Sequence, residues 1–223
     1  AGPEAVAAAV LATYGFGFAT STRAAGDMHL DGGDAARAAR NLFTRQHGGG
    51  LPLVCGRQVH EATIVTAASS SAIVHDATDG IIVPAGIPVT AGAFTADCLA
   101  IGIFDVRRGD FALVHSGWKG TGLGIAGLAL NRLLGNGSRV EDLHVAFSPS
   151  IKICCYEVGD EFARLFPDGP FERIKDRLHF DNEGRVASDL ERRGIPRAQI
   201  HRNPACTFCD PARRFHSHRR DKA

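Results

Sequence analysis

The sequence predicts an α+β fold. Short apolar runs typical of strands and longer runs with helical spacing follow one another without strict alternation, which favours α+β over a regular parallel sheet. Two apolar runs, Leu99 to Phe104 and Phe111 to Val114, flank a polar break that contains Gly109, and this pattern is typical of an antiparallel hairpin. An apolar, alanine-rich run from Leu123 to Leu134 predicts a helix directly after the hairpin. The hairpin and this helix therefore form the predicted centre of the chain.

The other elements are expected in order along the chain. Residues 4–12 are expected to form a short helix or an irregular arm, and residues 34–45 a helix with Asp34 as its N-cap. Residues 158–166 predict another helix, ended by Pro167, and residues 189–193 belong to a further one. Strands are expected at residues 14–22, 53–66, 79–83, 89–95 and 143–148, with a last strand beginning at Ile200.

Cys98 and His115 stand at the open end of the predicted hairpin. With the turn near Val106 to Arg108, Cys98 lies opposite or diagonal to His115, about 5–8 Å away. A register shift of two residues would keep both on one face, and a shift of one would separate them. The glycine-rich turn Ser116 to Gly120 then leads into the helix, whose first N–H groups favour an anion. The sequence thus predicts a thiol and an imidazole beside an anion-binding turn.

Length, charge and cysteine content limit the possible classes of protein. At 223 residues and 44% apolar content, the chain predicts one domain over residues 1–223 with one substantial core. The formal charge of +1 gives no large field, and no stretch approaches the roughly 18 apolar residues of a membrane span, so we expect neither nucleic-acid nor membrane partners. Six cysteines without regular spacing favour a reduced, cytoplasmic protein over a disulfide framework.

Two constellations between residues 60 and 127 compete for the chemistry. His60, Cys98 and His115 supply three N and S donors, and three such ligands with a fourth position left to water is the arrangement of a catalytic zinc site. Each also has an ordinary structural interpretation, as a small buried thiol or a hydrogen-bonded imidazole. The glycines of Gly122-Leu-Gly124-Ile-Ala-Gly127 match a dinucleotide-binding pattern, but no acidic residue ends the next strand, so close helix packing is the favoured interpretation.

A third constellation lies near the C-terminus. Cys206-Thr-Phe-Cys209 supplies only two of the four ligands that structural zinc needs, and Pro211 argues against the helix start of a redox pair. A structural thiol pair is therefore the favoured interpretation. Cys154 and Cys155 have no ligand partner at useful spacing and are interpreted as packing residues.

Five motifs occur in a characteristic order along the chain. They are Arg57-Gln-Val-His60, Thr95-Ala-Asp-Cys98, His115-Ser-Gly-Trp-Lys-Gly120, Pro149-Ser-Ile151 with Cys154-Cys-Tyr-Glu-Val158, and Cys206-Thr-Phe-Cys-Asp210 through Ser217-His-Arg-Arg-Asp221. Together they resemble the YfiH/laccase-domain family, also called polyphenol oxidase or peptidoglycan editing factor. The resemblance covers residues 16–221.

The resemblance implies a YfiH-like, four-layer α/β/β/α fold with mixed β-sheets. It also implies phosphorolysis of purine nucleosides, including adenosine, inosine and 5′-methylthioadenosine, and deamination of adenosine. Inorganic phosphate is then the co-substrate, and purine nucleosides are the small-molecule partners. A metal-dependent site is implied at His60, Cys98 and His115, which are also the implied catalytic residues, with zinc expected and copper as the alternative.

Further roles follow from the same resemblance. Arg23, Arg57 and Lys119 are implied to contact the substrate or phosphate. Lys119 stands where the family commonly has arginine, so the charge is kept while the bidentate fork is lost. Asp97 is a candidate to orient a ligand or to protonate the leaving base, with capping of its turn as the alternative.

Two other functions stay open at this stage. A multicopper phenol oxidase would fit the older family label, but such centres use many histidines, and only His216 and His218 form a His-x-His pair. A cysteine hydrolase with Cys98 as nucleophile and His115 as base would fit the peptidoglycan-editing label. Stoichiometric copper would favour the first, and activity retained in chelator the second.

Overall fold

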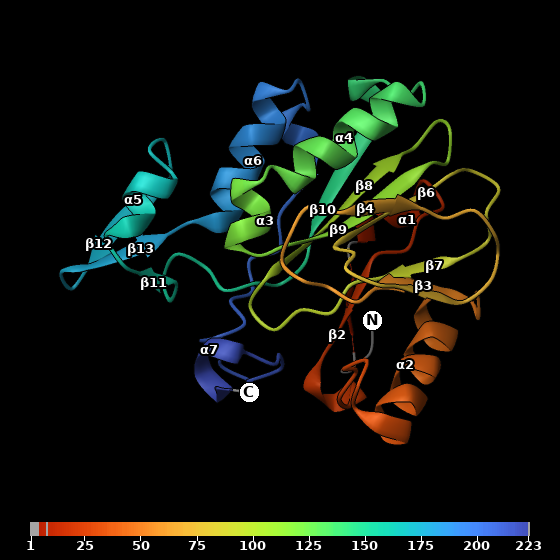
Figure 1. Ribbon diagram of the computed structural model, residues 1–223, viewed down its shortest axis with the longest axis horizontal. Helices are drawn as coiled ribbons and strands as arrows, with labels where there is room; N and C mark the ends of the chain where they lie inside the picture. The colour runs from red at the N-terminus through yellow and green to blue at the C-terminus, as the bar shows by residue number, and fades with distance from the viewer. Residues whose placement is uncertain (1–4, 8, 223) are drawn as a thin grey trace.

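The central sheet of the protein has six strands. The computed structural model describes residues 5–7 and 9–222. The strands lie in the order β14-β10-β8-β9-β6-β4, so that the β8–β9 hairpin occupies the middle of the sheet (Figure 1). Their bounds are β4 (Ile64–Thr66), β6 (Gly80–Val83), β8 (Leu99–Asp105), β9 (Phe111–Ser116), β10 (Leu143–Phe147) and β14 (Ile200–His201).

The β8–β9 hairpin has the register that the sequence predicts for a shared face. The two strands pair antiparallel, with Leu99 opposite Ser116 and Ala100 opposite His115. Cys98 precedes this ladder by one residue and is therefore diagonal to His115 on the same face. The predicted hairpin is confirmed.

Helices cover one face of the central sheet. In Figure 1, α4 (Ile125–Gly135) and α6 (Asn182–Arg192) lie above β8, β9 and β10, with the short α3 (Trp118–Gly122) beside them. Buried side chains from helices and sheet form the largest core, and each large aliphatic side chain in it contributes about 1.5–3 kcal/mol of burial free energy. These side chains include Ile101, Val114, Leu130, Val145 and Leu190.

The helix predicted over residues 123–134 is α4, and the glycine-rich stretch before it, which the sequence predicts as a turn, forms the short helix α3. Gly124 adopts a left-handed conformation (φ 73°) between α3 and α4, which a glycine does without steric cost. Gly127 packs so closely on Arg193 that a Cβ would lie 2.6 Å from its guanidinium. The packing interpretation is therefore confirmed for Gly127, whereas a Cβ at Gly122 would make only ordinary contacts and one at Gly124 would meet nothing within 4 Å.

A second sheet covers the opposite face. It consists of β5 (Ile73–His75), β3 (Leu53–Gly56) and β7 (Thr90–Gly92), all parallel. A smaller core, which includes Val54, Ile81 and Val89, lies between the two sheets. The long α2 (Gly33–His47) lies beneath β3 and β7 in Figure 1. Helices, central sheet, second sheet and α2 are the four layers of an α/β/β/α fold. The central sheet is mixed, as expected, whereas the second sheet is parallel.

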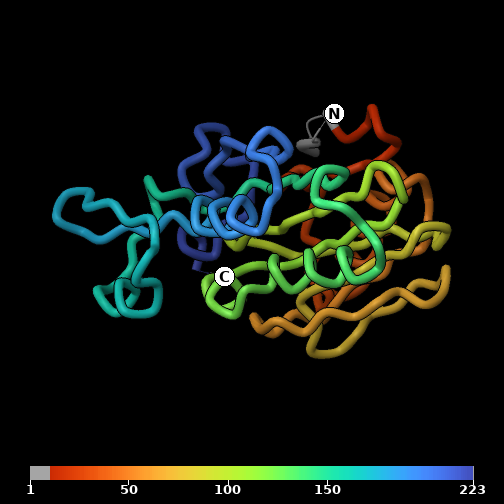
Figure 2. Tube along the Cα trace, turned by 90° about the horizontal axis from the view of Figure 1, so that it is seen from above, coloured from red at the N-terminus to blue at the C-terminus, as the bar shows by residue number. Residues whose placement is uncertain are grey.

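A small hairpin layer projects from one end of these layers. Figures 1 and 2 show it as the cyan extension that carries α5. Four aromatic side chains of this region pack around Phe180, which is fully buried. Its elements are β11 (Glu157–Val158), α5 (Glu161–Leu165), β12 (Phe171–Ile174) and β13 (Arg177–Phe180). The other α-helices and strands in the described part of the chain are β1 (Ala5–Ala7), α1 (Ala9–Ala12), β2 (Ala19–Ser21) and α7 (His218–Asp221).

The structure corrects several predicted boundaries. The expected strand over residues 53–66 is interrupted by a loop at residues 57–63, in which His60 has a positive φ of 62° that no strand residue adopts. The expected strand over residues 14–22 is limited to β2, and residues 157–158 pair as β11 before α5 begins. The helix expected at residues 189–193 begins at residue 182, where Asp181 accepts a hydrogen bond from Gly184 as N-cap.

The start of α2 differs in the same way. The helix begins at residue 33, so Gly32 is the N-cap, and Asp34 lies in the first turn without a capping hydrogen bond. Its carboxylate instead pairs with Arg37. Glu4, the first residue of the expected N-terminal helix or arm, lies outside the described residues. No helix in the described part of the chain is long and apolar enough to span a membrane.

Candidate active site

Three predicted ligand residues meet at the open end of the hairpin. The donor atoms of His60, Cys98 and His115 all lie within 4.8 Å of one another. The two imidazole rings approach edge to face, with centroids 4.7 Å apart. The hairpin places Cys98 and His115, and the loop between β3 and β4 adds His60 from the side.

A buried carboxylate that the sequence analysis missed orients this group. Asp79 precedes β6, is 3% exposed, and accepts a hydrogen bond of 2.8 Å from Nδ1 of His115. With Nδ1 occupied, the free Nε2 of His115 is the atom available to a ligand. Although burial raises the pKa of Asp79, the hydrogen bonds from His115 and from two backbone N–H groups bring it below its ordinary value. Asp79 is therefore an anion that fixes the tautomer of His115.

The same carboxylate shapes the loop that carries His60. Its oxygens accept hydrogen bonds from the backbone N–H groups of Val59, His60 and Glu61 at 3.0–3.2 Å. These bonds hold His60 in its left-handed conformation, which costs roughly 1–3 kcal/mol for a residue other than glycine. Burial and the neighbouring His115 lower the pKa of His60, so its imidazole is neutral and can act as a ligand at neutral pH.

Cys98 lies half-buried between charged neighbours. Burial, with the negative charges of Asp97 and Asp79, raises the pKa of its thiol to about 12. Without a cation beside it, this thiol is protonated at neutral pH and is a poor nucleophile. A positive ion at the site would lower the pKa of this thiol, because a thiol that coordinates a metal ion is deprotonated.

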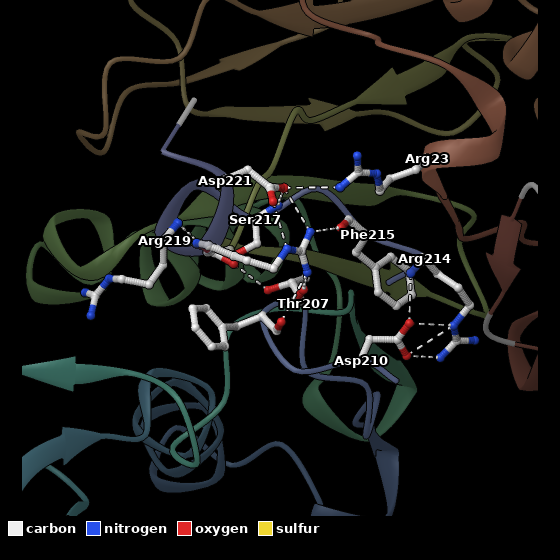
Figure 3. A network of polar contacts seen from close by, with 11 residues as sticks. Arg23, Thr207, Asp210, Arg214, Phe215, Ser217, Arg219 and Asp221 are labelled. Atoms are coloured by element: carbon white, nitrogen blue, oxygen red, sulfur yellow. Dashed lines mark hydrogen bonds and ion pairs between the residues drawn. The ribbon is translucent and has the colours of Figure 1, made fainter. Parts of the chain in front are cut away.

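Asp97 is engaged with the C-terminal segment of the chain. It has a positive φ of 95°, and its carboxylate accepts hydrogen bonds from Oγ1 of Thr207 (2.6 Å), Oγ of Ser217 (3.0 Å) and the backbone N–H of Arg219 (2.7 Å). Figure 3 shows the surrounding network, in which Thr207, Ser217 and Arg219 lie close together. Asp97 thereby ties the residue before Cys98 to the C-terminal segment.

A large cleft opens onto the three donor atoms. Its volume is about 1760 Å³, and its lining includes His60, Cys98 and His115. Gly117 leaves room beside them, because a Cβ there would lie 3.0 Å from Sγ of Cys98 and 3.1 Å from Cδ2 of His60. Other lining residues, which the sequence analysis did not single out for the site, are Trp118, Tyr156, Arg173, Arg177 and Arg219.

The predicted substrate-binding cations lie in different places. Arg57 lines the cleft and pairs with Asp31 at 2.7 Å and with Asp76 at 3.4 Å, both exposed. Lys119 is exposed at the start of α3, close enough to His60 to lower the pKa of that imidazole, but it is not among the lining residues that the structure describes. Arg23 likewise lies outside that lining and pairs with Asp221 at 3.4 Å in the C-terminal network (Figure 3).

The three donors fit a metal ion. One thiolate and two imidazoles are the ligand types that zinc prefers, and three protein ligands with an open position define a catalytic zinc site. The hydrogen bond from His115 to Asp79 is the carboxylate–histidine arrangement found behind zinc-binding histidines. The donor set, its spacing and the adjoining cleft together agree with a metal-dependent active site.

Solved structures share this architecture. The chain superposes on the hypothetical protein YfiH of Bacillus licheniformis with a TM-score of 0.88 over 99% of this chain and 92% of that chain, at 23% sequence identity. YlmD from Geobacillus stearothermophilus gives a TM-score of 0.83 over 100% of this chain and 89% of that chain, at 25% identity. The fold is therefore of the YfiH class.

Sequence comparison identifies the family. The family model described as multi-copper polyphenol oxidoreductase laccase matches residues 15–223, and the chain belongs to this family. A purine nucleoside phosphorylase of Aquifex aeolicus (strain VF5) is 35% identical over 134 residues, 60% of this chain and 61% of the relative. Adenosine deaminase RL5, from an unknown prokaryotic organism, is 30% identical over 140 residues, 59% of this chain and 53% of the relative. The matches therefore span about half to three fifths of the length of these two relatives.

Proposed function

We propose that the protein is a purine nucleoside phosphorylase, acting on adenosine, inosine and 5′-methylthioadenosine, with adenosine deaminase activity at the same site. The observation that carries this proposal is the His60–Cys98–His115 group at a cleft, with Asp79 behind His115. Relatives that bear these two activities in their names support the substrate class. A nucleoside and inorganic phosphate are the proposed small-molecule partners.

In this proposal His60, Cys98 and His115 hold zinc. Zinc in such a site supplies Lewis acidity and activates water for attack on a purine carbon. Asp79 keeps Nε2 of His115 directed at the site and makes the ring a stronger ligand. In deamination, water replaces the 6-amino group of adenosine, which leaves as ammonia. In phosphorolysis, a phosphate oxygen bonds to the anomeric carbon of the sugar as the bond to the purine nitrogen breaks.

Phosphate needs cations beside the sugar. Arg57 is the proposed contact, because it lines the cleft and its two partners, Asp31 and Asp76, are exposed. Exposed ion pairs contribute only about 0–1 kcal/mol, so phosphate can replace them at little cost. Lys119 is proposed to add positive charge at the start of α3, near His60. Arg23 pairs with Asp221, and we propose that it holds the C-terminal segment in place and does not contact the substrate directly.

Asp97 is proposed to position Cys98 and not to protonate the leaving base. Its carboxylate accepts three hydrogen bonds, which engage both oxygens with the C-terminal segment. Of the two roles that the sequence analysis considered for Asp97, capping of its turn agrees better with these hydrogen bonds than protonation of the leaving base. Cys98, His60 and His115 keep the proposed catalytic roles.

Copper chemistry is the second candidate, because two histidines and one cysteine also form blue-copper sites. Within the described residues, however, His60, Cys98 and His115 form the one metal-binding group that contains histidine, so support for several coppers is lacking. The raised pKa of Cys98, about 12, counts against a metal-free cysteine hydrolase. Stoichiometric copper with blue absorbance would favour the oxidase over the phosphorylase.

The test is product analysis with the whole chain. The protein is incubated with inosine or adenosine, with and without phosphate, and the products are separated by chromatography. We expect hypoxanthine from inosine only when phosphate is present, and inosine from adenosine without it. Cys98→Ala should lower both rates about 10³-fold, equal to about 4 kcal/mol of lost transition-state stabilisation. Cys55→Ala, at a buried cysteine outside the site, is the matched control, and retained turnover in Cys98→Ala would reject the site.

A further inference from the structure

Four cysteines from two distant segments meet on the side of the molecule that carries the C-terminal segment. Cys154 and Cys155 lie between β10 and β11, and Cys206 and Cys209 follow β14. All four Sγ atoms lie within 4.8 Å of one another, and all four thiols are free. The sequence analysis treated the first pair as packing and the second as a lone thiol pair, and the structure corrects both interpretations by bringing them together.

The spacing of the sulfur atoms fits a tetrahedral metal site. Four thiolates at the usual zinc–sulfur distance of about 2.3 Å form a tetrahedron with edges of about 3.8 Å. Sγ of Cys154 and Sγ of Cys209 are 3.8 Å apart. A disulfide would need about 2.05 Å between these atoms, so the observed separation matches one edge of a metal-binding tetrahedron.

The backbone around Cys206 is arranged for a thiolate. The N–H of Lys152 donates to Sγ of Cys206 at 3.5 Å, and the N–H groups of Phe208 and Cys209 also point at this sulfur. Ser150 and Cys206 form a parallel bridge that holds the two segments in register. N–H donors of this kind offset the negative charge that accumulates where four thiolates surround one divalent ion.

We propose that Cys154, Cys155, Cys206 and Cys209 form a structural site for a divalent zinc-like metal ion, separate from the His60–Cys98–His115 group. Four cysteines with no open position are the ligand set of a structural zinc site. The ion would fasten the segment after β14 to the loop after β10.

A metal ion at the four cysteines would also affect the cleft, because the segment that follows Cys209 contacts the cleft wall. The segment after Cys209 carries Ser217 and Arg219, which bond to Asp97 beside Cys98. It also carries His216, which lines the cleft. A metal ion at the four-cysteine site would therefore fix one wall of the cleft without taking part in the reaction.

Metal content of matched variants tests the proposal. Zinc per chain is measured in the whole protein, in Cys98→Ala, in Cys154→Ser/Cys209→Ser and in the triple variant. Cys154 and Cys209 are exposed, so replacing them removes no core packing. We expect two zinc ions per chain in the unchanged protein, one in Cys98→Ala, one in the double variant and none in the triple variant, with Cys55→Ser as the control that keeps both. A Cys98→Ala chain without zinc would overturn the proposal.

A second measurement does not depend on altering the cluster. Cobalt(II) added to metal-free Cys98→Ala should give the intense near-ultraviolet absorption of thiolate-bound cobalt. Chelation of the zinc form of Cys98→Ala should raise the number of reactive thiols by four. A disulfide between Cys154 and Cys209 in freshly purified protein, or no gain in reactive thiols, would overturn the four-cysteine site. Phosphorolysis assays are not involved, so failure here and failure of the proposed function are separate results.

Discussion

The His60–Cys98–His115 group and the four-cysteine cluster are built from different kinds of structural element. The first lies at the end of the central β8–β9 hairpin, with a buried carboxylate, Asp79, behind one ligand. The second lies entirely in loops, and backbone N–H groups take the place of a carboxylate. One faces a cleft of about 1760 Å³, whereas none of the four cysteines lines that cleft in the described chain.

This difference agrees with our proposals that the first group is catalytic and the second is structural. Three ligands and a cleft leave a position for substrate, while four thiols complete a tetrahedron and leave none. A rigid hairpin suits the first, because small displacements of catalytic groups are costly. Loops suit the second, because a metal ion that binds there can order them. The two groups should therefore respond differently to changes in their surroundings.

Of the variants that keep all three ligands, Asp79→Asn should have the largest effect on the His60–Cys98–His115 group while leaving the four-cysteine cluster unchanged. The asparagine amide would face backbone N–H groups that now donate to a carboxylate, and His115 would lose its anionic partner. Loss of such a partner typically costs 10–100-fold in metal affinity or activity. We expect that loss in kcat/KM and in zinc affinity of the His60–Cys98–His115 group, with zinc at the four-cysteine cluster unchanged.

Asp110→Asn is the matched control for that change. Asp110 is also buried and accepts hydrogen bonds from Ala85 and Arg108, but it lies at the turn end of the hairpin. It should lower stability without changing zinc affinity. Equal zinc affinity in Asp79→Asn and Asp110→Asn would mean that Asp79 has only a structural role.

The hairpin could be predicted from sequence because its signals are local. Two apolar runs around a polar turn set the register, and the register places Cys98 and His115 on one face. Asp79 could not be found this way, because a Thr-Asp-Gly stretch before a strand has the composition of an ordinary turn. Its role depends on the His60 loop folding over it, and the strand predicted across that loop hid the reversal at His60.

The four-cysteine cluster was missed for a related reason. Neither cysteine pair has a second pair at the spacing of a metal motif, and their meeting depends on β14 pairing beside β10. The parallel bridge between Ser150 and Cys206 then aligns the two loops. Contacts of this kind depend on tertiary packing, which local sequence patterns do not encode. The one hint in the sequence was that four cysteines, in two pairs, each lacked the further ligands that a metal site needs.

Gly117→Ala tests how tightly the His60–Cys98–His115 group is packed. The new Cβ would lie 3.0 Å from Sγ of Cys98 and 3.1 Å from His60, so one ligand must move by a few tenths of an ångström. We expect roughly a tenfold loss in kcat/KM, because displacements below 1 Å already weaken catalysis. Gly135→Ala is the control, since nothing lies within 4 Å of its Cβ position. Unchanged kinetics in Gly117→Ala would show that Cys98 and His60 can shift to accommodate a methyl group without loss of catalysis.

The smallest expected effect is the pH dependence contributed by His60. Burial and the neighbouring His115 lower its pKa from 6.5, so the folded state stays neutral at pH values where the unfolded chain already binds a proton. Its contribution to stability is therefore present above pH 6.5 and declines as the pH falls toward the lower folded pKa. A metal ion held by the four cysteines is also bound less tightly as the pH falls, because protons compete for the thiolates, so His60 must be tested with variants that all keep this cluster.

A variant pair isolates this contribution. Cys98→Ala removes metal from the His60–Cys98–His115 group, and Cys98→Ala/His60→Gln also removes the titrating ring. Thermal unfolding between pH 7.5 and 5 should show a steeper loss of melting temperature in the single variant than in the double variant. His144 and His201, whose pKa values burial also lowers, are present in both and cancel in the comparison. If the melting temperatures of the two variants fell equally with pH, His60 would take up a proton as readily in the folded chain as in the unfolded one. The close approach of its ring to His115 would then not persist without metal.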